Sequence, residues 1–139
     1  MEDAHNFKVA VVTPAGKVFD YGKATLVVLH TVSGETGVMA NHNPFVSALR
    51  ISEVKVKNDD EDYQELLAVN GGFVEFTNNQ LTIVADAAEK AADIDVNRAE
   101  TARQRAERRL KEAHDKREQD RAQAALLRAV NRIHAATGR

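Results

Sequence analysis

The stretch QLTIVADAAEKAADIDVNRAETARQRAERRLKEA, residues 80–113, contains the point at which the hydrophobic pattern of the chain changes. Its first part, QLTIVAD, has the length and composition of a β-strand. After Asp86 the chain has no proline and no glycine before Gly138, and it is dominated by the good helix formers Ala, Arg, Glu, Lys and Gln. The stretch therefore predicts a β domain over residues 1–87 and a helical domain over residues 88–139.

Short apolar runs with turn residues between them fill the chain before this boundary. In ISEVKVK, Val54 and Val56 share one face of a pleat, whereas Glu53, Lys55 and Lys57 share the other. The other runs are FKVAVV (7–12), ATLVVLHTV (24–32), QELLAVN (64–70), GFVEF (72–76) and QLTIVAD (80–86). The predicted turns are TPAGK (13–17), SGETG (33–37), KNDDED (57–62), NGG (70–72) and TNNQ (77–80). This pattern predicts an antiparallel β-sandwich.

Apolar residues in the helical part recur at steps of three and four positions, which predicts two amphipathic helices joined near AHDKREQ, residues 113–119. Asp93 or Asp95 is expected to cap the first helix. The two apolar stripes are Ala99, Ala102, Ala106, Leu110 and Ala113, and Ala122, Leu126, Ala129, Val130 and Ile133. Because alanine buries little apolar area, we predict an antiparallel hairpin that is held weakly and can exchange partners.

Composition excludes several classes of protein. A chain of 139 residues suits one small domain with an appendage and is too short for a large multi-domain enzyme. The absence of cysteine excludes a disulfide framework and is consistent with a reducing compartment. The N-terminus lacks a basic leader region, and the longest apolar run, ATLVVL, is far shorter than a membrane span. We therefore expect neither export nor a transmembrane segment.

Charge is divided unequally between the two parts of the chain. Residues 1–87 carry 6 basic and 12 acidic side chains, whereas residues 88–139 carry 13 basic and 9 acidic ones. The arginines of the helical part have four possible roles: binding nucleic acid, binding a small phosphorylated ligand, docking on an acidic protein, or keeping a helix soluble. Glu100 and Glu107 lie three and four positions from Arg103, and Glu112 lies four and three positions from Arg108 and Arg109. This is the spacing of solvated ion pairs, which favours the last role for these arginines.

Motifs of conventional catalysis are missing. The sequence has no GxSxG, no P-loop, no HExxH and no GxGxxG, and NGG precedes a strand instead of a helix. The five histidines show no metal-ligand spacing. We therefore expect neither a catalytic site nor a bound metal.

Several segments together resemble one known family. These are SGETGVMANHNPFVSAL (33–49), LAVNGGFVEFTNNQLTIVAD (67–86) and DIDVNRA (93–99), in a chain of strands followed by Ala/Arg helices. The combination is similar to the epsilon subunit of the bacterial F-type ATP synthase, and the similarity spans essentially the whole chain. The resemblance implies a non-catalytic subunit of the central stalk, peripheral to the cytoplasmic face of the plasma membrane.

The resemblance also implies partners and a regulatory role. In this family the sandwich binds the gamma subunit and the c-ring, so it touches the membrane only indirectly. The hairpin either folds down or extends along gamma into the alpha/beta head, where it inhibits ATP hydrolysis. Glu35 and His42 match positions of the family that face the rotor, and Arg103, Arg108 and Arg109 are expected to be solvated or to face the head.

Residues 94–99 resemble the ATP-sensing motif I/L-D-x-x-R-A of one branch of the family, with every specified position present. The resemblance implies ATP as a regulatory ligand that favours the folded-down hairpin, with no obligatory cofactor. The implied ATP-binding residues are Glu89, Ile94, Asp95, Arg98, Ala99 and Arg105 from the first helix region and Arg128 and Arg132 from the second. Arg128 and Arg132 are four positions apart, so they share one helical face. Each guanidinium group can bind two phosphate oxygens at once.

Two alternatives of other classes remain open at this point. One is a stand-alone domain that binds or hydrolyses nucleotide. The other is a basic-helix module that binds nucleic acid, which is disfavoured by the lack of aromatic residues between the arginines and by the acidic first part.

Overall fold

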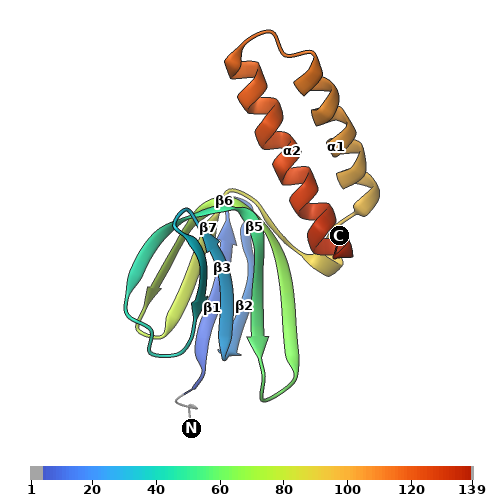
Figure 1. The fold of residues 1–139 in the computed structure, drawn as a ribbon. Coiled ribbons are helices and arrows are strands. Elements are labelled where there is room, and N and C mark those ends of the chain that lie inside the picture. Colours follow the sequence, from blue (N-terminus) through green and yellow to red (C-terminus); the bar gives the residue numbers. More distant parts are fainter. Residues whose placement is uncertain (1–4, 139) are drawn as a thin grey trace. The chain divides into compact units, whose positions relative to one another are not determined.

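Eight strands form the first part of the chain in the computed structural model, which describes residues 5–138 (Figure 1). The strands are β1 (Phe7–Thr13), β2 (Gly16–Ala24), β3 (Leu26–Thr31), β4 (Gly34–Val38), β5 (Phe45–Asn58), β6 (Tyr63–Thr77), β7 (Gln80–Ala85) and β8 (Ala88–Lys90). The chain divides into two compact units, one ending at Lys90 and one beginning at Ala91, and each unit is described by itself.

The strands are hydrogen-bonded in the order β2-β1-β7-β6-β5-β3-β4. The long strand β6 pairs with β5 along its length, with β7 through Gly72–Thr77, and with β8 through Leu67–Val69. Strands β1 and β2 also contact β8 without pairing with it, so the sheet folds over on itself (Figure 1). The predicted β-sandwich is thus confirmed. One pair, β1 with β7, is parallel. Parallel neighbours need a long connection, and here strands β2 to β6 provide it.

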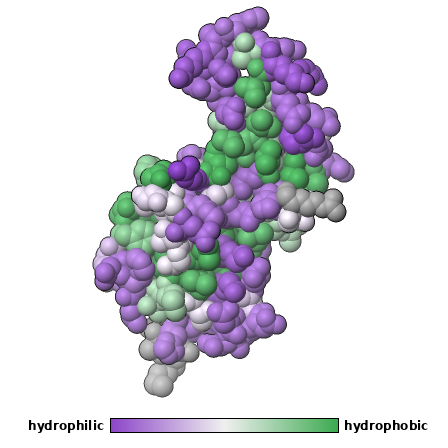
Figure 2. Space-filling view, in the orientation of Figure 1, coloured by the Kyte–Doolittle hydropathy of each residue, from purple (hydrophilic) through white to green (hydrophobic). Residues whose placement is uncertain are grey.

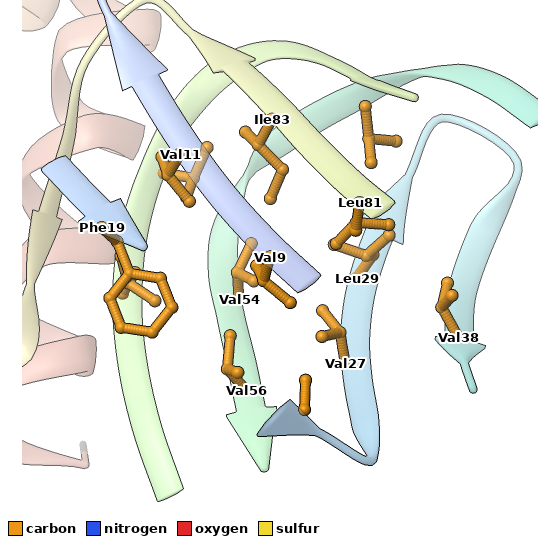
Figure 3. Packing of buried hydrophobic residues seen from close by; sticks show 14 of the residues in the cluster. Val9, Val11, Phe19, Val27, Leu29, Val38, Val54, Val56, Leu81 and Ile83 are labelled. Carbon is orange, nitrogen blue, oxygen red and sulfur yellow. The ribbon is translucent and has the colours of Figure 1, made fainter. Parts of the chain in front are cut away.

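Alternate side chains of the strands point into one apolar core. Val54 is 1% exposed and Val56 is fully buried, so the predicted division of ISEVKVK between core and solvent is confirmed. Figure 3 shows side chains from several strands meeting in this core. Those labelled there are Val9, Val11, Phe19, Val27, Leu29, Val38, Val54, Val56, Leu81 and Ile83. Burial of these side chains, at ~1.5–3 kcal/mol for each large one, holds the sheets together.

Two predicted turns are strand residues instead. The turn of SGETG lies at Val32–Ser33, and Gly34–Val38 forms strand β4. NGG lies inside β6, where Gly71 and Gly72 have φ values of 85° and 124°. A Cβ atom on Gly72 would lie 2.2 Å from the carbonyl oxygen of Val84 on the neighbouring strand. Glycine is therefore needed here because the neighbouring strand approaches closely. In the sequence, such a glycine pair looks the same as a pair that forms a turn. The other three predicted turns are confirmed.

Two helices, α1 (Val96–Lys111) and α2 (Lys116–Thr137), follow a short 3-10 turn η1 (Ala91–Asp93). Asp95 caps α1, because its carboxylate accepts a hydrogen bond from the Arg98 amide at 3.1 Å. Asp115 caps α2 in the same way, through the Glu118 amide at 2.8 Å. The predicted antiparallel hairpin is confirmed, and of the two predicted caps the structure uses Asp95.

Alanine methyl groups form the seam of the hairpin. Ala99, Ala106, Ala122 and Ala129 are all at most 3% exposed. Val130, which the periodicity assigns to the seam, is 44% exposed, because it follows Ala129 and points about 100° away from it around the helix. Hydrophilic side chains surround the end where the helices are joined, and a hydrophobic band follows their length (Figure 2).

The two units divide between Lys90 and Ala91, three residues after the end of the β domain expected from the sequence. Ala88, Glu89 and Lys90 form β8 and pair with Val69, Ala68 and Leu67, and helix α1 begins only at Val96. The alanine-rich composition of residues 87–92 favours a helix, but the open edge of β6 provides backbone partners that override this preference.

We predict that Gly72→Ala destabilises the sheet unit strongly and that Gly22→Ala does not. A Cβ atom at Gly72 meets backbone atoms of Val84 and Ala85, whereas one at Gly22 meets nothing within 4 Å. The expected loss for Gly72→Ala is at least ~3 kcal/mol in the free energy of unfolding, measured by urea denaturation. Equal stabilities of the two variants would contradict the strand approach described above.

We also predict that residues 1–90, expressed alone, unfold in one cooperative thermal transition. The core of the sheet unit is built from its own strands. A fragment of residues 1–87 should melt at a lower temperature, because it lacks the backbone pairing of β8 with β6. Circular dichroism at increasing temperature measures both transitions, and a fragment 1–90 without a sigmoidal transition would show that the sheet depends on the helices.

Candidate functional site

The first turn of α1 carries the sequence motif at residues 94–99. Ile94 is 8% exposed and Ala99 is fully buried, so these two residues fix the start of the helix. Asp95 uses its Oδ1 atom for the cap. The Arg98 side chain is exposed. The motif therefore combines two apolar anchors and a cap with one arginine that is available to a ligand.

Arginines from both helices line one hollow at this end of the hairpin. Arg98 and Arg105 come from α1, and Arg132 comes from α2. The hollow has a volume of about 330 Å³, and Asn97, Thr101 and Ala102 complete its lining. Within residues 5–138, neither Arg98 nor Arg105 forms an ion pair. The structure thus brings together three of the four arginines that the motif implies.

The fourth arginine, Arg128, lines a second hollow of about 770 Å³ between the helices. Its lining also contains Arg109 and Arg121, together with Glu112, Glu118, Ala122, Ala124 and Ala125. Arg128 and Arg132 lie one turn apart on α2, so the two hollows are adjacent along that helix. Arg128 and Arg132 therefore share one face of α2, as predicted, but they line different hollows.

Glu89 was expected in the first helix region, and this placement is wrong. It lies on β8, half-buried and paired with Ala68, in the sheet unit. The other predicted ATP-binding residues all belong to the helical unit. Glu89 lies outside the helical unit because residues 88–90 form the strand β8, which the sequence did not predict.

The guanidinium group of Arg103 is engaged by acidic side chains of its own helix, α1. It forms ion pairs with Glu100 and Glu107, as the spacing predicts. The ion pairs that the spacing also predicts between Glu112 and Arg108 or Arg109 do not form within residues 5–138. The hydrogen bond to Glu100 is the main reason that the pKa of Arg103 is raised. Arg103 lines neither hollow, so the charge available to a ligand comes from the other arginines.

The two predicted rotor-facing residues lie in the sheet unit. Glu35 is on β4 and not in a turn, opposite His30 of β3, with 3.9 Å between its Oε2 atom and the His30 Nδ1 atom. His42 lies in the loop before β5, where its ring packs edge-on against Phe45 and Phe76, with centroid distances of 5.1 and 5.9 Å. Glu35 is therefore open to a partner, whereas His42 also has a structural role.

An apolar patch on the outer face of the sheet was not found from the sequence. Val46, Phe73 and Val84 are 69%, 61% and 56% exposed, and they lie on the neighbouring strands β5, β6 and β7. Phe73 pairs directly with Val84. The signal is present in GFVEF and QLTIVAD, where apolar residues occupy both faces of the strand. A monomeric protein seldom exposes such a patch without a partner.

No group of three or more His, Cys, Asp or Glu side chains within residues 5–138 could hold a metal ion. None of the helices in that range has both the length and the apolar character that crossing a membrane requires.

Comparison with known families decides the assignment. The family model described as ATP synthase, Delta/Epsilon chain, beta-sandwich domain matches residues 6–91, and the one described as ATP synthase, Delta/Epsilon chain, long alpha-helix domain matches residues 92–137. The chain belongs to the ATP synthase delta/epsilon family. Members of this family are non-catalytic subunits of the complex, as the sequence predicts for this chain.

Two curated relatives carry the name ATP synthase epsilon chain. The one from Pediococcus pentosaceus is 51% identical over 91% of this chain and 91% of its own length. The one from Lacticaseibacillus casei is 47% identical over 98% of this chain and 97% of its own length. The predicted resemblance to epsilon subunits is therefore confirmed.

Solved structures share the fold of this family member. A chain of the Euglena gracilis mitochondrial ATP synthase, from a structure of OSCP, F1 and the c-ring, gives a TM-score of 0.75 at 18% identity, covering 91% of this chain and 78% of that one. A chain of the Tetrahymena thermophila central stalk and c-ring gives a TM-score of 0.64 at 11% identity, covering 98% and 100%.

Proposed function

We propose that the chain is the epsilon subunit of the rotor in a bacterial F-type ATP synthase, and that ATP regulates its hairpin. In this proposal the sandwich binds gamma and the c-ring, and the extended hairpin inhibits ATP hydrolysis in the alpha/beta head. ATP binding favours the contracted, non-inhibitory hairpin. The observation that carries the regulatory part is the hollow to which α1 contributes Arg98 and Arg105 and α2 contributes Arg132.

A ligand in this hollow would connect the two helices. Each guanidinium group offers a planar pair of donors that matches phosphate oxygens. Because the seam between the helices is made of alanine, the hairpin has little apolar burial of its own to hold it. A ligand that binds only the closed hairpin stabilises it by RT ln(1 + [L]/Kd), about 2.7 kcal/mol at 100 times Kd.

The motif residues around the hollow suggest how the rest of the nucleotide is held. Ile94 and Ala99 are buried and fix the start of α1, and the Asp95 cap uses Oδ1 alone. We propose that Asp95 and the neighbouring backbone lie near the adenine, as the resemblance implies, and that Arg128 adds a fourth guanidinium to the phosphates. Phosphates that are met by arginines do not require a magnesium ion.

Surface features of the sheet unit support the proposed stalk contacts. The patch of Val46, Phe73 and Val84 offers exposed apolar area for gamma, since large apolar patches mark protein interfaces. Glu35, whose side chain is 70% exposed, remains the proposed contact to the c-ring, together with His42. We propose that the complex places the chain at the cytoplasmic face of the plasma membrane, where it is attached only through its partners.

Membership of the epsilon family favours this proposal over both alternatives. A basic-helix module that binds nucleic acid would be expected to expose aromatic side chains among its arginines, and neither hollow contains one. A stand-alone nucleotide hydrolase would show turnover in the isolated chain. An ATPase assay of the purified chain and co-purification of gamma, alpha, beta and c from native membranes test the assignment directly.

We predict that millimolar ATP raises the melting temperature of the isolated chain and increases amide protection in both helices, with or without magnesium. Arg98→Ala and Arg128→Ala should each weaken the effect, by about tenfold in apparent affinity, because each removes one charged donor pair. Arg109→Ala serves as the matched control on α1, because the motif does not include it.

Losses of equal size from all three substitutions would indicate diffuse attraction to a basic surface. A chain that does not respond to millimolar ATP would contradict the regulatory part of the proposal and leave the stalk assignment in place.

We predict that deleting residues 91–139 raises ATP hydrolysis by the reconstituted enzyme at low ATP and leaves ATP synthesis largely intact. The deletion follows the boundary of the two units, so β8 and the sheet remain complete. Hydrolysis rates with the full-length and the shortened subunit, at equal incorporation, measure the effect. Identical rates at every ATP concentration would show that this hairpin is not inhibitory.

A further inference from the structure

Six arginines lie along one side of the helical hairpin. On α1, positions 98, 105 and 109 share one face, because steps of seven and four residues return to nearly the same angle. On α2, positions 121, 128 and 132 share a face for the same reason. These six arginines are divided between the two hollows described above. The hollows follow one another along this side of the hairpin and form a groove between the helices, and the proposed ATP site takes the hollow near the start of α1 together with Arg128.

The part of the groove near the joined ends of the helices is the larger hollow, of about 770 Å³. Arg109 from α1 and Arg121 and Arg128 from α2 stand around it. Within residues 5–138, none of these three side chains forms an ion pair. Ala122, Ala124 and Ala125 line it with small apolar groups that leave the space open.

We propose that this hollow is a second anion site that takes a small polyvalent phosphate, of which inorganic pyrophosphate is the simplest example. Three guanidinium groups from two helices can surround a compact anion with several oxygens, and each can bind two oxygens at once. A long polyanion such as nucleic acid would instead need positive charge that continues past the hollow. At the joined end the groove meets Glu112 and Glu118, which oppose such a continuation.

Glu112 and Glu118 limit the length of the anion that the hollow can accept, but they do not neutralise its arginines. Glu118 is engaged locally, because its Oε2 atom accepts a hydrogen bond from the His114 amide at 2.9 Å. Glu112 lies at the end of α1 and lowers the potential of the hollow. The arginines still outnumber the glutamates in the lining, so the hollow remains attractive to anions.

This site is separate from the proposed ATP site in all residues but one. Arg98, Arg105 and Arg132 line the smaller hollow, whereas Arg109 and Arg121 line the larger one. Arg128 lines the larger hollow and lies one turn from Arg132, so it is the residue through which the two ligands affect each other. The second site does not require bound ATP, and variants of Arg98 and Arg109, each of which lines one hollow only, test the two sites separately.

The test is isothermal titration of the full chain with inorganic pyrophosphate in the absence of magnesium. The expected result is saturable binding of one pyrophosphate per chain. Arg109→Ala and Arg121→Ala should each weaken it by about tenfold, the loss expected for one charge-assisted donor group. Arg98→Ala should weaken it less than Arg109→Ala does, because Arg98 lines only the smaller hollow, whose arginines also attract phosphate. Arg108→Ala is the matched control, since Arg108 precedes Arg109 on α1, is exposed, and lines neither hollow.

Two further variants separate a built site from general attraction. Arg109→Lys keeps the charge but loses the paired donors, so a site predicts weaker binding, whereas diffuse attraction predicts no change. Glu112→Gln should tighten binding, because it removes an opposing charge. Circular dichroism of each variant shows whether the hairpin is still helical. If the alanine variants have lost their helices, Arg109→Lys and Glu112→Gln provide the test.

Several outcomes would overturn the proposal. One is equal weakening by Arg108→Ala and Arg109→Ala. Another is an absence of saturation by millimolar pyrophosphate. A third is binding of an Asp/Glu-rich peptide that depends on Arg109 and Arg121 while pyrophosphate does not bind, which would make the groove a protein contact. Loss of the ATP response in Arg98→Ala bears on the ATP site alone, so failure of one site is distinguishable from failure of the other.

Discussion

The continuous antiparallel pairing of β5 with β6 is the interaction on which the sheet unit depends. It runs from Phe45 opposite Phe76 to Asn58 opposite Tyr63, and β3 attaches to β5 while β7 and β8 attach to different halves of β6. Strands this long cannot remain flat and still enclose a core, because sheets twist. Gly71 and Gly72 adopt backbone angles that other residues rarely take, and Gly72 lets β7 approach closely. The two layers of the sandwich follow from this arrangement.

The helical unit obeys a different constraint, which is the small size of the side chains between its helices. Alanine at the seam lets the helices lie close together, so arginines on either side of the seam reach the same groove. The same methyl groups bury little area, so the closed hairpin is stabilised less than one with a leucine seam would be. Close approach of the helices and weak stabilisation of the closed hairpin thus have one cause, and both would suit the control by ATP that is proposed above.

Placement of the acidic residues decides which arginines can act. Arg103 is neutralised by Glu100 and Glu107 on its own helix, so it contributes little positive potential. Five arginines of the groove form no ion pair within residues 5–138 and are exposed to water, which lowers the cost of keeping them charged; they are Arg98, Arg105, Arg109, Arg121 and Arg128. The basic character of the helical unit is therefore concentrated along one side of the hairpin, where an anion would touch both helices.

Periodicity and composition alone determined the fold class and the positions of both helices, because these depend on local preferences and on the spacing of apolar residues. They also indicated the Asp95 cap and the ion pairs of Arg103, which involve residues close together in sequence. The family was indicated separately, by the resemblance of three segments to epsilon subunits. Only the tertiary structure decided that NGG belongs to a strand and that Glu89 belongs to the sheet, because both depend on backbone partners far away in the chain. It also decided that Arg109 and Arg121 share a hollow with Arg128, since the register between two helices is set by their seam and not by either sequence alone.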